Sequence, residues 1–157
     1  KDIICGICPK KEINWNAVLE AARTGVPVDK WKEHSGSYNV NILNNNQKFF
    51  NIDEPLEVRD AGTGLMVVKR QVFENLKDKV PYYINNTNDT SGIMKLGEKI
   101  SEFFTTSIDD QSKVLLSEDF HFCHLWRKQG GSIHVAPWVK LAHYGAYLFE
   151  GSPVKKS

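Results

Sequence analysis

The chain has 157 residues, 41% of them hydrophobic and 25% charged, and its formal net charge at pH 7 is +1. This length and composition predict one soluble globular domain over residues 1–157, with enough apolar side chains to form a core. A charge so close to zero provides no field that would draw the chain to nucleic acid. No apolar run approaches the roughly 20 residues that a membrane-spanning helix needs.

The first part of the chain alternates strand-like and helix-like segments. Residues 2–8 predict a buried strand that ends at a proline turn. Asn14 can cap a helix over residues 15–23, because its side chain can accept a hydrogen bond from a backbone N–H of the first turn. A glycine and a proline follow where this helix would end. Residues 36–42 alternate polar and apolar side chains, which predicts another strand.

An Ala-Gly-Thr-Gly loop follows two short predicted strands at residues 48–52 and 56–58. Two glycines separated by one residue, Gly62 and Gly64, allow a backbone to pass close to a ligand, and a tight turn between strands is the simpler interpretation. The loop lacks the Gly-Lys-Ser/Thr ending of a phosphate-binding P-loop. It leads into an apolar strand at residues 65–68, which we expect to be central in the sheet, like the first strand.

The remaining elements are weaker, apart from one helix taken up below. A short helix is predicted over residues 71–76. Residues 81–97 are polar and rich in asparagine, which predicts a mobile loop. Residues 132–136 and 138–145 predict two strands separated by a proline. The tail, residues 151–157, is basic and is expected to fray.

The three cysteines bear on the compartment and on metal binding. Cys5 and Cys8 form a C-x-x-C pair, and Cys123 stands alone. An odd number of thiols cannot all pair, and no signal-peptide pattern opens the chain, so we expect a reducing, cytoplasmic environment. A C-x-x-C pair occurs in half zinc sites and in redox pairs. No second pair follows, and the apolar surroundings favour structural cysteines, with zinc binding and a disulfide or redox role as the alternatives.

The most informative stretch lies at residues 115–126, where two adjacent carboxylates open a predicted helix. Ser117 is a favourable N-cap, because its hydroxyl can accept a hydrogen bond from an orphan backbone N–H. Glu118 and Asp119 then occupy the first turn, where the helix dipole favours negative charge. An apolar stripe follows, and a pair of glycines ends the helix. Satisfying the dipole is the simpler role for the two acids, and their place at the rim of a core makes a chemical role the alternative.

Several short motifs follow one another along most of the chain: Ile-Ile-Cys-Gly at 3–6 with Pro-Lys-Lys at 9–11, Ala-Gly-Thr-Gly-Leu-Met at 61–66 with Lys-Arg at 69–70, Leu-Ser-Glu-Asp at 116–119 with Phe-Cys at 122–123, Trp-Arg at 126–127 with Gly-Gly at 130–131, and Leu-Ala-His-Tyr-Gly at 141–145 after Pro137. In this order they resemble the acceptor-side portion of a GT-A-type glycosyltransferase, most similar to the small family-2-like enzymes of bacteria, phages and large DNA viruses. The resemblance implies an α/β fold with a partial GT-A, Rossmann-like mixed sheet flanked by helices. It also implies transfer of a sugar from a nucleotide-sugar donor to a hydroxyl of a glycan or another acceptor, with inversion.

One hallmark of that family is missing. Such enzymes hold the divalent metal of the nucleotide-sugar with an Asp-x-Asp motif at the end of an upstream strand, and this chain contains no Asp-x-Asp. Asp109 and Asp110 are adjacent rather than alternating. The first strand resembles the one that follows the missing motif, and the chain begins with Lys1 rather than methionine. The resemblance therefore implies an absent N-terminal nucleotide-binding half, supplied by the same gene product or by a second chain.

The resemblance assigns roles to particular residues. Asp119 resembles the general base that takes the proton of the acceptor hydroxyl, and Glu118 beside it would orient the acceptor or the base. His143 resembles the C-terminal ligand of a divalent cation, Mn²⁺ or Mg²⁺, which would neutralise the departing diphosphate. Without the resemblance, a histidine at a strand end is usually a hydrogen-bonded structural residue.

Three further groups would contact the substrates. Gly62-Thr63-Gly64 would form a close backbone floor beneath donor and acceptor. Trp126 could stack on a sugar, although its helical spacing also suits a place in the core. Lys10 could meet a phosphate or an acidic acceptor, although a solvated turn is the simpler place for it.

Two other classes of function fit parts of the sequence. A nucleotidyltransferase can use a similar α/β scaffold, but it needs a glycine-rich signature near its N-terminus, and this chain shows none there. A small binding module without catalytic activity, stabilised by zinc, could use Cys5, Cys8, Cys123 and a histidine. Tightly held stoichiometric zinc would indicate the module, whereas weak Mn²⁺ binding that depends on nucleotide would indicate the transferase.

Overall fold

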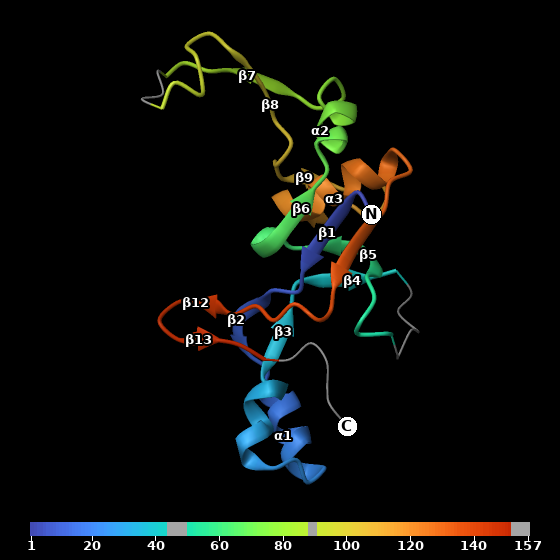
Figure 1. The fold of residues 1–157 in the computed structure, drawn as a ribbon, viewed down its shortest axis with the longest axis vertical. Coiled ribbons are helices and arrows are strands. Elements are labelled where there is room, and N and C mark those ends of the chain that lie inside the picture. The colour runs from blue at the N-terminus through green and yellow to red at the C-terminus, as the bar shows by residue number, and fades with distance from the viewer. Residues whose placement is uncertain (44–49, 88–90, 152–157) are drawn as a thin grey trace. The chain divides into compact units, whose positions relative to one another are not determined.

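The computed structural model describes residues 1–43, 50–87 and 91–151. The chain forms two compact units where composition predicts a single domain. Unit 1 combines Lys1–Val67 with Ser132–Ser157, and unit 2 is Val68–Gly131. The N-terminal and C-terminal parts of the sequence thus build one unit together, and the middle of the chain builds the other (Figure 1).

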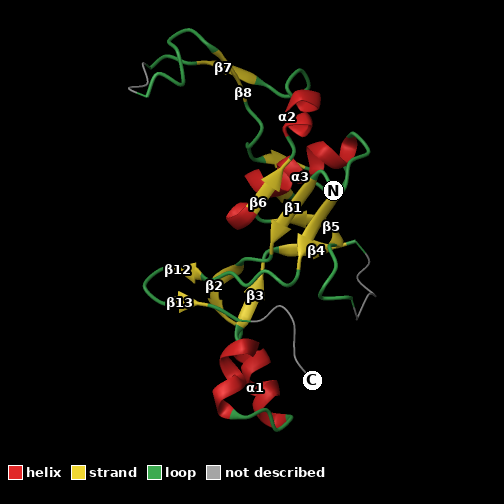
Figure 2. Ribbon diagram, in the orientation of Figure 1, coloured by secondary structure: helices red, strands yellow, loops and turns green. Residues whose placement is uncertain are grey.

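A mixed sheet forms the centre of unit 1. Its five described strands lie in the order β4-β5-β11-β1-β6, with bounds Val40–Ile42, Leu56–Ala61, Ile133–Ala136, Ile3–Gly6 and Met66–Val68. Strands β1 and β11 are parallel, whereas β5 runs antiparallel to both β11 and β4. The predicted α/β class with a mixed sheet is confirmed at this level, since the chain contains both helices and strands and its central sheet has parallel and antiparallel pairs (Figure 2).

Burial explains which strands are central. All four residues of β11 are buried, as expected of a strand covered on both faces. Ile3 of β1 pairs with Ile133 of β11, and neither side chain is exposed to solvent. The first strand therefore lies inside the sheet, as predicted. The prediction for residues 65–68 is wrong, because β6 lies at the end of the strand order and Leu65 belongs to a 3₁₀ turn.

A second layer of unit 1 surrounds the C-x-x-C-Pro turn. Strand β2, Pro9–Ile13, pairs with β3, Gly36–Tyr38. The hairpin of β12, His143–Tyr144, and β13, Leu148–Phe149, lies against β2 (Figure 1). The single strand predicted over residues 36–42 is instead two strands, because the chain leaves one sheet for the other at Asn39.

The strand predicted over residues 138–145 is largely wrong, since only its end forms β12. Pro137 has no N–H to donate to a strand ladder, and the Val139 N–H donates to the Ala136 carbonyl, N···O 3.1 Å. The chain therefore turns where a second strand was expected.

Helix α1, Trp15–Arg23, forms at the predicted bounds. Asn14 caps it as predicted, because its side-chain oxygen accepts a hydrogen bond from the Ala17 N–H at 3.0 Å. Gly25 ends the turn that follows with φ +81°, a left-handed conformation that glycine adopts without strain. A 3₁₀ helix, η1, then covers Val28–His34.

Unit 2 is built from α2, Arg70–Leu76, and α3, Glu118–Lys128, with two short strand pairs. Strand β7, Tyr82–Ile84, pairs with β8, Lys99–Ser101, and β9, Ser107–Ile108, pairs with β10, Leu115–Leu116. Apolar side chains of α2 and α3 are buried, and Phe122 stacks on Phe73 and Phe104 at ring-centroid distances of 5.5 and 4.5 Å.

Three sequence predictions fall wholly or partly on residues that the structure does not describe. The mobile loop predicted over residues 81–97 begins with β7, Tyr82–Ile84, and residues 88–90 of that stretch lie outside the described residues. Residues 50–52 form no strand, and the rest of the strand predicted at 48–52 lies outside the described residues, as does the tail beyond Gly151. None of the helices that the structure describes is long and apolar enough to cross a bilayer.

Candidate functional site

The first turn of α3 carries the two acidic residues that the sequence singles out. Ser117 is the N-cap, but its hydroxyl does not accept a backbone N–H as predicted. It donates instead to Oδ1 of Asp119, and the same oxygen accepts the Phe120 N–H at 2.9 Å. Asp119, two residues after the N-cap, thus takes over the capping function, because its carboxylate satisfies an orphan backbone donor that the serine leaves open.

The two carboxylates differ in their exposure to solvent. Asp119 is 7% exposed, whereas Glu118 is exposed to solvent. Successive residues of an α-helix point about 100° apart, so only one of two neighbours can face the interior of the unit. The fully buried Phe122 and Cys123 lie on the following turn of α3. Asp119 is therefore a carboxylate held in a fixed orientation at the edge of a packed core.

Trp126, a predicted sugar-stacking residue, is also buried. Only 7% of it is exposed, and a Cβ added at Gly131 would overlap its indole ring. The glycine thus lets the backbone close over the ring at the end of α3. This packing favours a structural role for Trp126, the alternative that its helical spacing already indicated.

A polar cluster that the sequence did not indicate ties α3 to the segment before it. The Ser107 hydroxyl lies 2.6 Å from Nδ1 of His121, and Nε2 of His124 lies 3.6 Å from Oδ1 of Asp109. Burial lowers the pKa of His121. Hydrogen bonds from the backbone and hydroxyl of Ser112 lower the pKa of Asp109.

This cluster anchors the chain just ahead of the two acids. Residues 107–112 lead into β10, which ends at Leu116, directly before Ser117. The only sequence signal for it is the spacing of two histidines three residues apart on a helix, which places both on one face.

The Gly-Thr-Gly segment of unit 1 forms a tight turn. The predicted loop is a 3₁₀ turn, η2, over Thr63–Leu65, between β5 and β6. The Gly62 N–H donates to the Asn39 carbonyl, N···O 3.0 Å. A Cβ added at Gly64 would lie 2.9 Å from Sγ of Cys8, so glycine is needed there for close approach of two segments.

His143 is positioned by the turn that contains Cys8. Its Nδ1 lies 3.1 Å from the Pro9 carbonyl oxygen. A carbonyl can only accept, so Nδ1 carries the proton and, in the neutral ring, Nε2 carries the lone pair. Metal-binding histidines usually have this arrangement, in which one ring nitrogen donates to the backbone and the other faces the cation.

Contacts within unit 1 bring three of the predicted site segments together. Gly64 packs on Cys8, and the next residue, Pro9, holds His143. Lys10 follows Pro9 on β2 and is exposed. In unit 2, Glu118, Asp119 and Trp126 share α3.

The three cysteines lie in apolar surroundings or close to them, with Cys5 and Cys123 buried and Cys8 partly buried. All three are free thiols, and Cys5 and Cys123 are buried in different units. Burial raises the pKa of Cys8. Across residues 1–43, 50–87 and 91–151, no three His, Cys, Asp or Glu side chains are gathered as ligands of one metal ion would be.

Comparison with protein-family models, with curated protein sequences and with solved structures finds no match for this chain.

Proposed function

We propose that the chain takes part in glycosyl transfer, moving a sugar from a nucleotide-sugar donor to an acceptor hydroxyl, with Asp119 as the general base. The observation that carries the proposal is the geometry of the Asp119 carboxylate. It is nearly buried, it opens α3, and hydrogen bonds from the Ser117 hydroxyl and the Phe120 N–H fix its orientation. A carboxylate in this position is oriented before a substrate arrives, which is what proton abstraction requires.

The Asp119 side chain would act when the acceptor hydroxyl attacks the anomeric carbon. The bond between that carbon and the nucleotide diphosphate breaks, the new glycosidic bond forms, and the hydroxyl proton passes to the carboxylate. Glu118, exposed on the neighbouring position, would accept a hydrogen bond from the acceptor and orient it.

His143 would hold a divalent cation, Mn²⁺ or Mg²⁺, through Nε2. The hydrogen bond from Nδ1 to Pro9 supports this, because it leaves the other nitrogen available as a ligand. The cation would neutralise charge on the departing diphosphate. Its further ligands would come from the N-terminal nucleotide-binding half that the sequence resemblance implies. The Gly62-Thr63-Gly64 turn and Lys10 lie on the same unit as His143 and would line the donor side.

The decisive experiment is a transfer assay with the complete enzyme, including the segment that the resemblance places upstream of Lys1. A panel of nucleotide-sugars is supplied with Mn²⁺, and wild type is compared with Asp119→Asn. Loss of a general base should lower the rate by roughly 10²–10⁴-fold, with donor binding nearly unchanged. Asp78→Asn, an exposed acid of the same unit, is the matched control and should transfer at the wild-type rate. An Asp119→Asn rate within a few-fold of wild type would overturn the assignment.

A further inference from the structure

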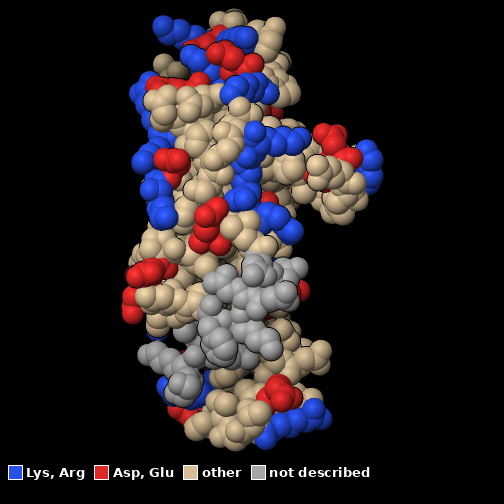
Figure 3. Space-filling view, turned by 90° about the vertical axis from the view of Figure 1, so that its right-hand side faces the viewer, with Lys and Arg blue, Asp and Glu red and all other residues tan. Residues whose placement is uncertain are grey.

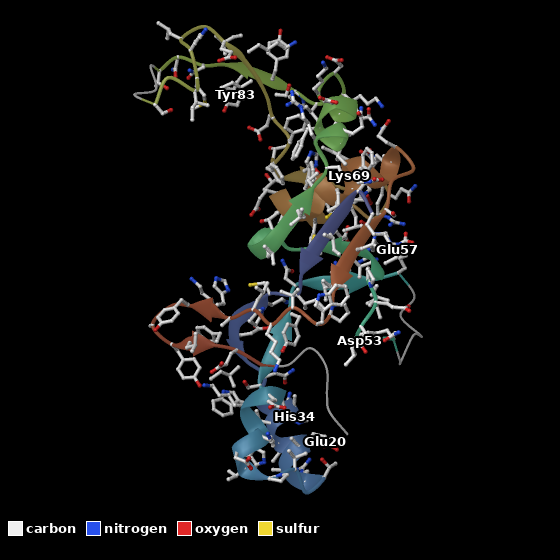
Figure 4. All side chains as sticks on the ribbon, viewed as in Figure 1. Glu20, His34, Asp53, Glu57, Lys69 and Tyr83 are labelled. Atoms are coloured by element: carbon white, nitrogen blue, oxygen red, sulfur yellow. The ribbon has the colours of Figure 1, made fainter. Side chains whose placement is uncertain are left out.

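A groove of about 440 Å³ lies within unit 2, between α2 and the strand pair β7–β8. Tyr83, labelled in Figure 4, is the middle residue of β7. One wall is a single face of α2 with its C-cap, because Arg70, Phe73, Glu74 and Lys77 recur at helical spacing. These positions span about 10 Å at the rise of an α-helix. The other wall is β8 with the segments before and after it, so the groove is elongated.

Apolar side chains line both walls of the groove. Phe73 of α2 meets Phe103 edge-on at a ring-centroid distance of 5.1 Å. Ile93 and Met94, from the connection between β7 and β8, lie on the opposite wall and are 80% and 42% exposed. A ligand that removes such side chains from water gains free energy in proportion to the apolar area covered. The volume of the groove is within the range of small-molecule sites.

Hydrogen bonds hold the two walls in place. The Ser101 hydroxyl donates to the Lys77 carbonyl, O···O 3.4 Å, and joins β8 to the end of α2. The side-chain amide of Asn85, which is 6% exposed, donates to the carbonyls of Thr87 and Lys95, N···O 2.8 and 3.0 Å. A two-stranded hairpin is only marginally stable alone, and these bonds fix its connection. The groove is therefore formed before a ligand arrives.

The charged groups of the groove leave one positive charge in excess. Arg70 pairs with Glu74, N···O 2.9 Å, and the neighbours Glu98 and Lys99 offset each other in charge. The Lys77 side chain forms no hydrogen bond or ion pair within residues 1–43, 50–87 and 91–151. An ammonium group beside apolar side chains calls for a ligand that carries one negative charge on an apolar body.

We propose that this groove binds a medium-chain fatty acid, with its carboxylate at Lys77 and its alkyl chain between Phe73 and Met94. A carboxylate only accepts hydrogen bonds and an ammonium group only donates them, so the two are complementary. An elongated apolar groove fits an alkyl chain, and methionine adapts its shape to such a chain. Inorganic phosphate fits less well, because it has no apolar part. Binding here requires no part of the transfer proposed above.

The test is a titration of decanoate, below its micelle concentration, into the chain, followed by calorimetry and by NMR shifts of the backbone amides. Decanol and decylamine have the same alkyl chain without the negative charge and are titrated in parallel. Wild type should bind decanoate saturably, with shifts in residues 70–77 and 93–103, and should bind the other two at least roughly fivefold more weakly. Lys77→Gln should lower the affinity for decanoate roughly fivefold and leave that for decanol unchanged.

A second variant tests the apolar wall. Ile93→Ser/Met94→Ser should weaken decanoate and decanol alike, by at least roughly tenfold, because apolar contacts with the chain are lost. Both side chains are exposed in the free chain, so the fold should be retained. The matched controls are Leu96→Ser and Lys95→Gln, at exposed positions of the same connection that do not line the groove, and both should bind as wild type does.

Three results would each overturn the proposal: no saturable binding of decanoate, equal affinity of wild type for decanoate and decanol, or unchanged decanoate affinity in Lys77→Gln. Sedimentation identifies the other occupant that the groove would fit. If decanoate does not bind and the chain self-associates in a manner that Ile93→Ser/Met94→Ser abolishes, a second copy of the chain covers the groove and the fatty-acid site is refuted.

Discussion

Two neighbouring acids on α3 differ in environment although they share a charge and a position in the first turn. Asp119 is buried and hydrogen-bonded, and Glu118 is exposed. The resemblance to the glycosyltransferase family favours Asp119 as the base. The structure adds a hydrogen bond from the Ser117 hydroxyl to Asp119, where the sequence predicted a hydrogen bond from a backbone N–H to that hydroxyl. A cap prediction assumes that the serine hydroxyl accepts a backbone N–H, whereas here the carboxylate two residues later accepts hydrogen bonds from both the serine hydroxyl and a backbone N–H.

The first prediction compares these acids in the complete enzyme. Glu118→Gln should lower the transfer rate less than Asp119→Asn and should show more of its effect in acceptor affinity, because an exposed side chain orients the acceptor without taking its proton. Steady-state kinetics with varied acceptor measure both effects. If Glu118→Gln abolishes transfer and Asp119→Asn leaves it intact, the two roles are reversed.

Ser117 gives a second prediction about the same carboxylate. Ser117→Ala removes the hydroxyl that donates to Asp119, so the rate should fall while Asp119 remains in place. Ser117→Thr keeps a hydroxyl and should retain most of the rate. Circular dichroism provides the control, because α3 should form in both variants. Equal rates for the alanine variant and wild type would show that this hydrogen bond does not position the base.

His134 links protonation to the stability of the central sheet. It lies on β11, is 3% exposed, and its Nδ1 has no hydrogen-bond partner among the described residues. Burial, followed by the charge of Lys1, lowers its pKa below the ordinary 6.5, whereas Glu57, labelled in Figure 4, acts in the opposite direction. The unfolded chain therefore binds this proton more readily than the folded chain.

The third prediction follows from that sign. The contribution of neutral His134 to the free energy of unfolding is fully present above pH 6.5 and is lost as the pH falls below it. Urea midpoints measured between pH 7.5 and 5 should fall with pH in wild type. His134→Leu removes the titrating group, so its midpoint should fall less over the same range. An equal fall in both proteins would mean that other groups, such as His121, dominate the acid response.

The sequence predicts correctly those helices and strands whose ends are set by nearby residues, and it fails for strands whose bounds depend on distant partners. Helix α1 matches its predicted bounds because its cap and its terminal glycine act within a few residues of the helix. The segments at residues 36–42 and 138–145 fail, because their division depends on which distant strand each part meets. A three-residue strand contains too little pattern to indicate its partner.

The site shows the same contrast. The sequence places Asp119 at the start of a helix, where it is found. It could not indicate that His143 meets Pro9, which lies 134 positions earlier in the chain.

The fourth prediction concerns the packing of η2 on the C-x-x-C turn. Gly64→Ala would place its Cβ 2.9 Å from Sγ and 3.0 Å from Cβ of Cys8, so the free energy of unfolding should fall by about 1–3 kcal/mol. The double variant Gly64→Ala/Cys8→Ala removes the sulfur and should recover part of the loss. Chemical denaturation of the two variants and of Cys8→Ala alone measures the coupling. Additive effects of the two substitutions would contradict this contact.

On the face shown in Figure 3, basic and acidic side chains are interspersed, in keeping with the net charge of +1. The central sheet has β4 and β6 at the two ends of its described strand order, and Val67 of β6 is 60% exposed. Exposed edge strands provide unpaired backbone groups for pairing between chains.

The fifth prediction is that the isolated chain self-associates through β6. Sedimentation velocity at increasing concentration should show association of wild type, and Val67→Lys should reduce it, because a charged side chain on an edge strand opposes pairing. Val67→Thr keeps a β-branched residue and should associate as wild type does. A clean monomer at high concentration would contradict the prediction.

The position of β11 has a consequence for how the protein is made. Strand β11 separates β1 from β5, although both of those strands leave the ribosome long before residues 133–136 are synthesised. Unit 2 is one continuous stretch of sequence, so all of it has been synthesised before β11 exists. Non-local strand pairing is slow to form, and domains generally fold as units during synthesis. The unit that begins the chain is thus the last to be completed, and β1 must wait for β11 while the nascent chain grows.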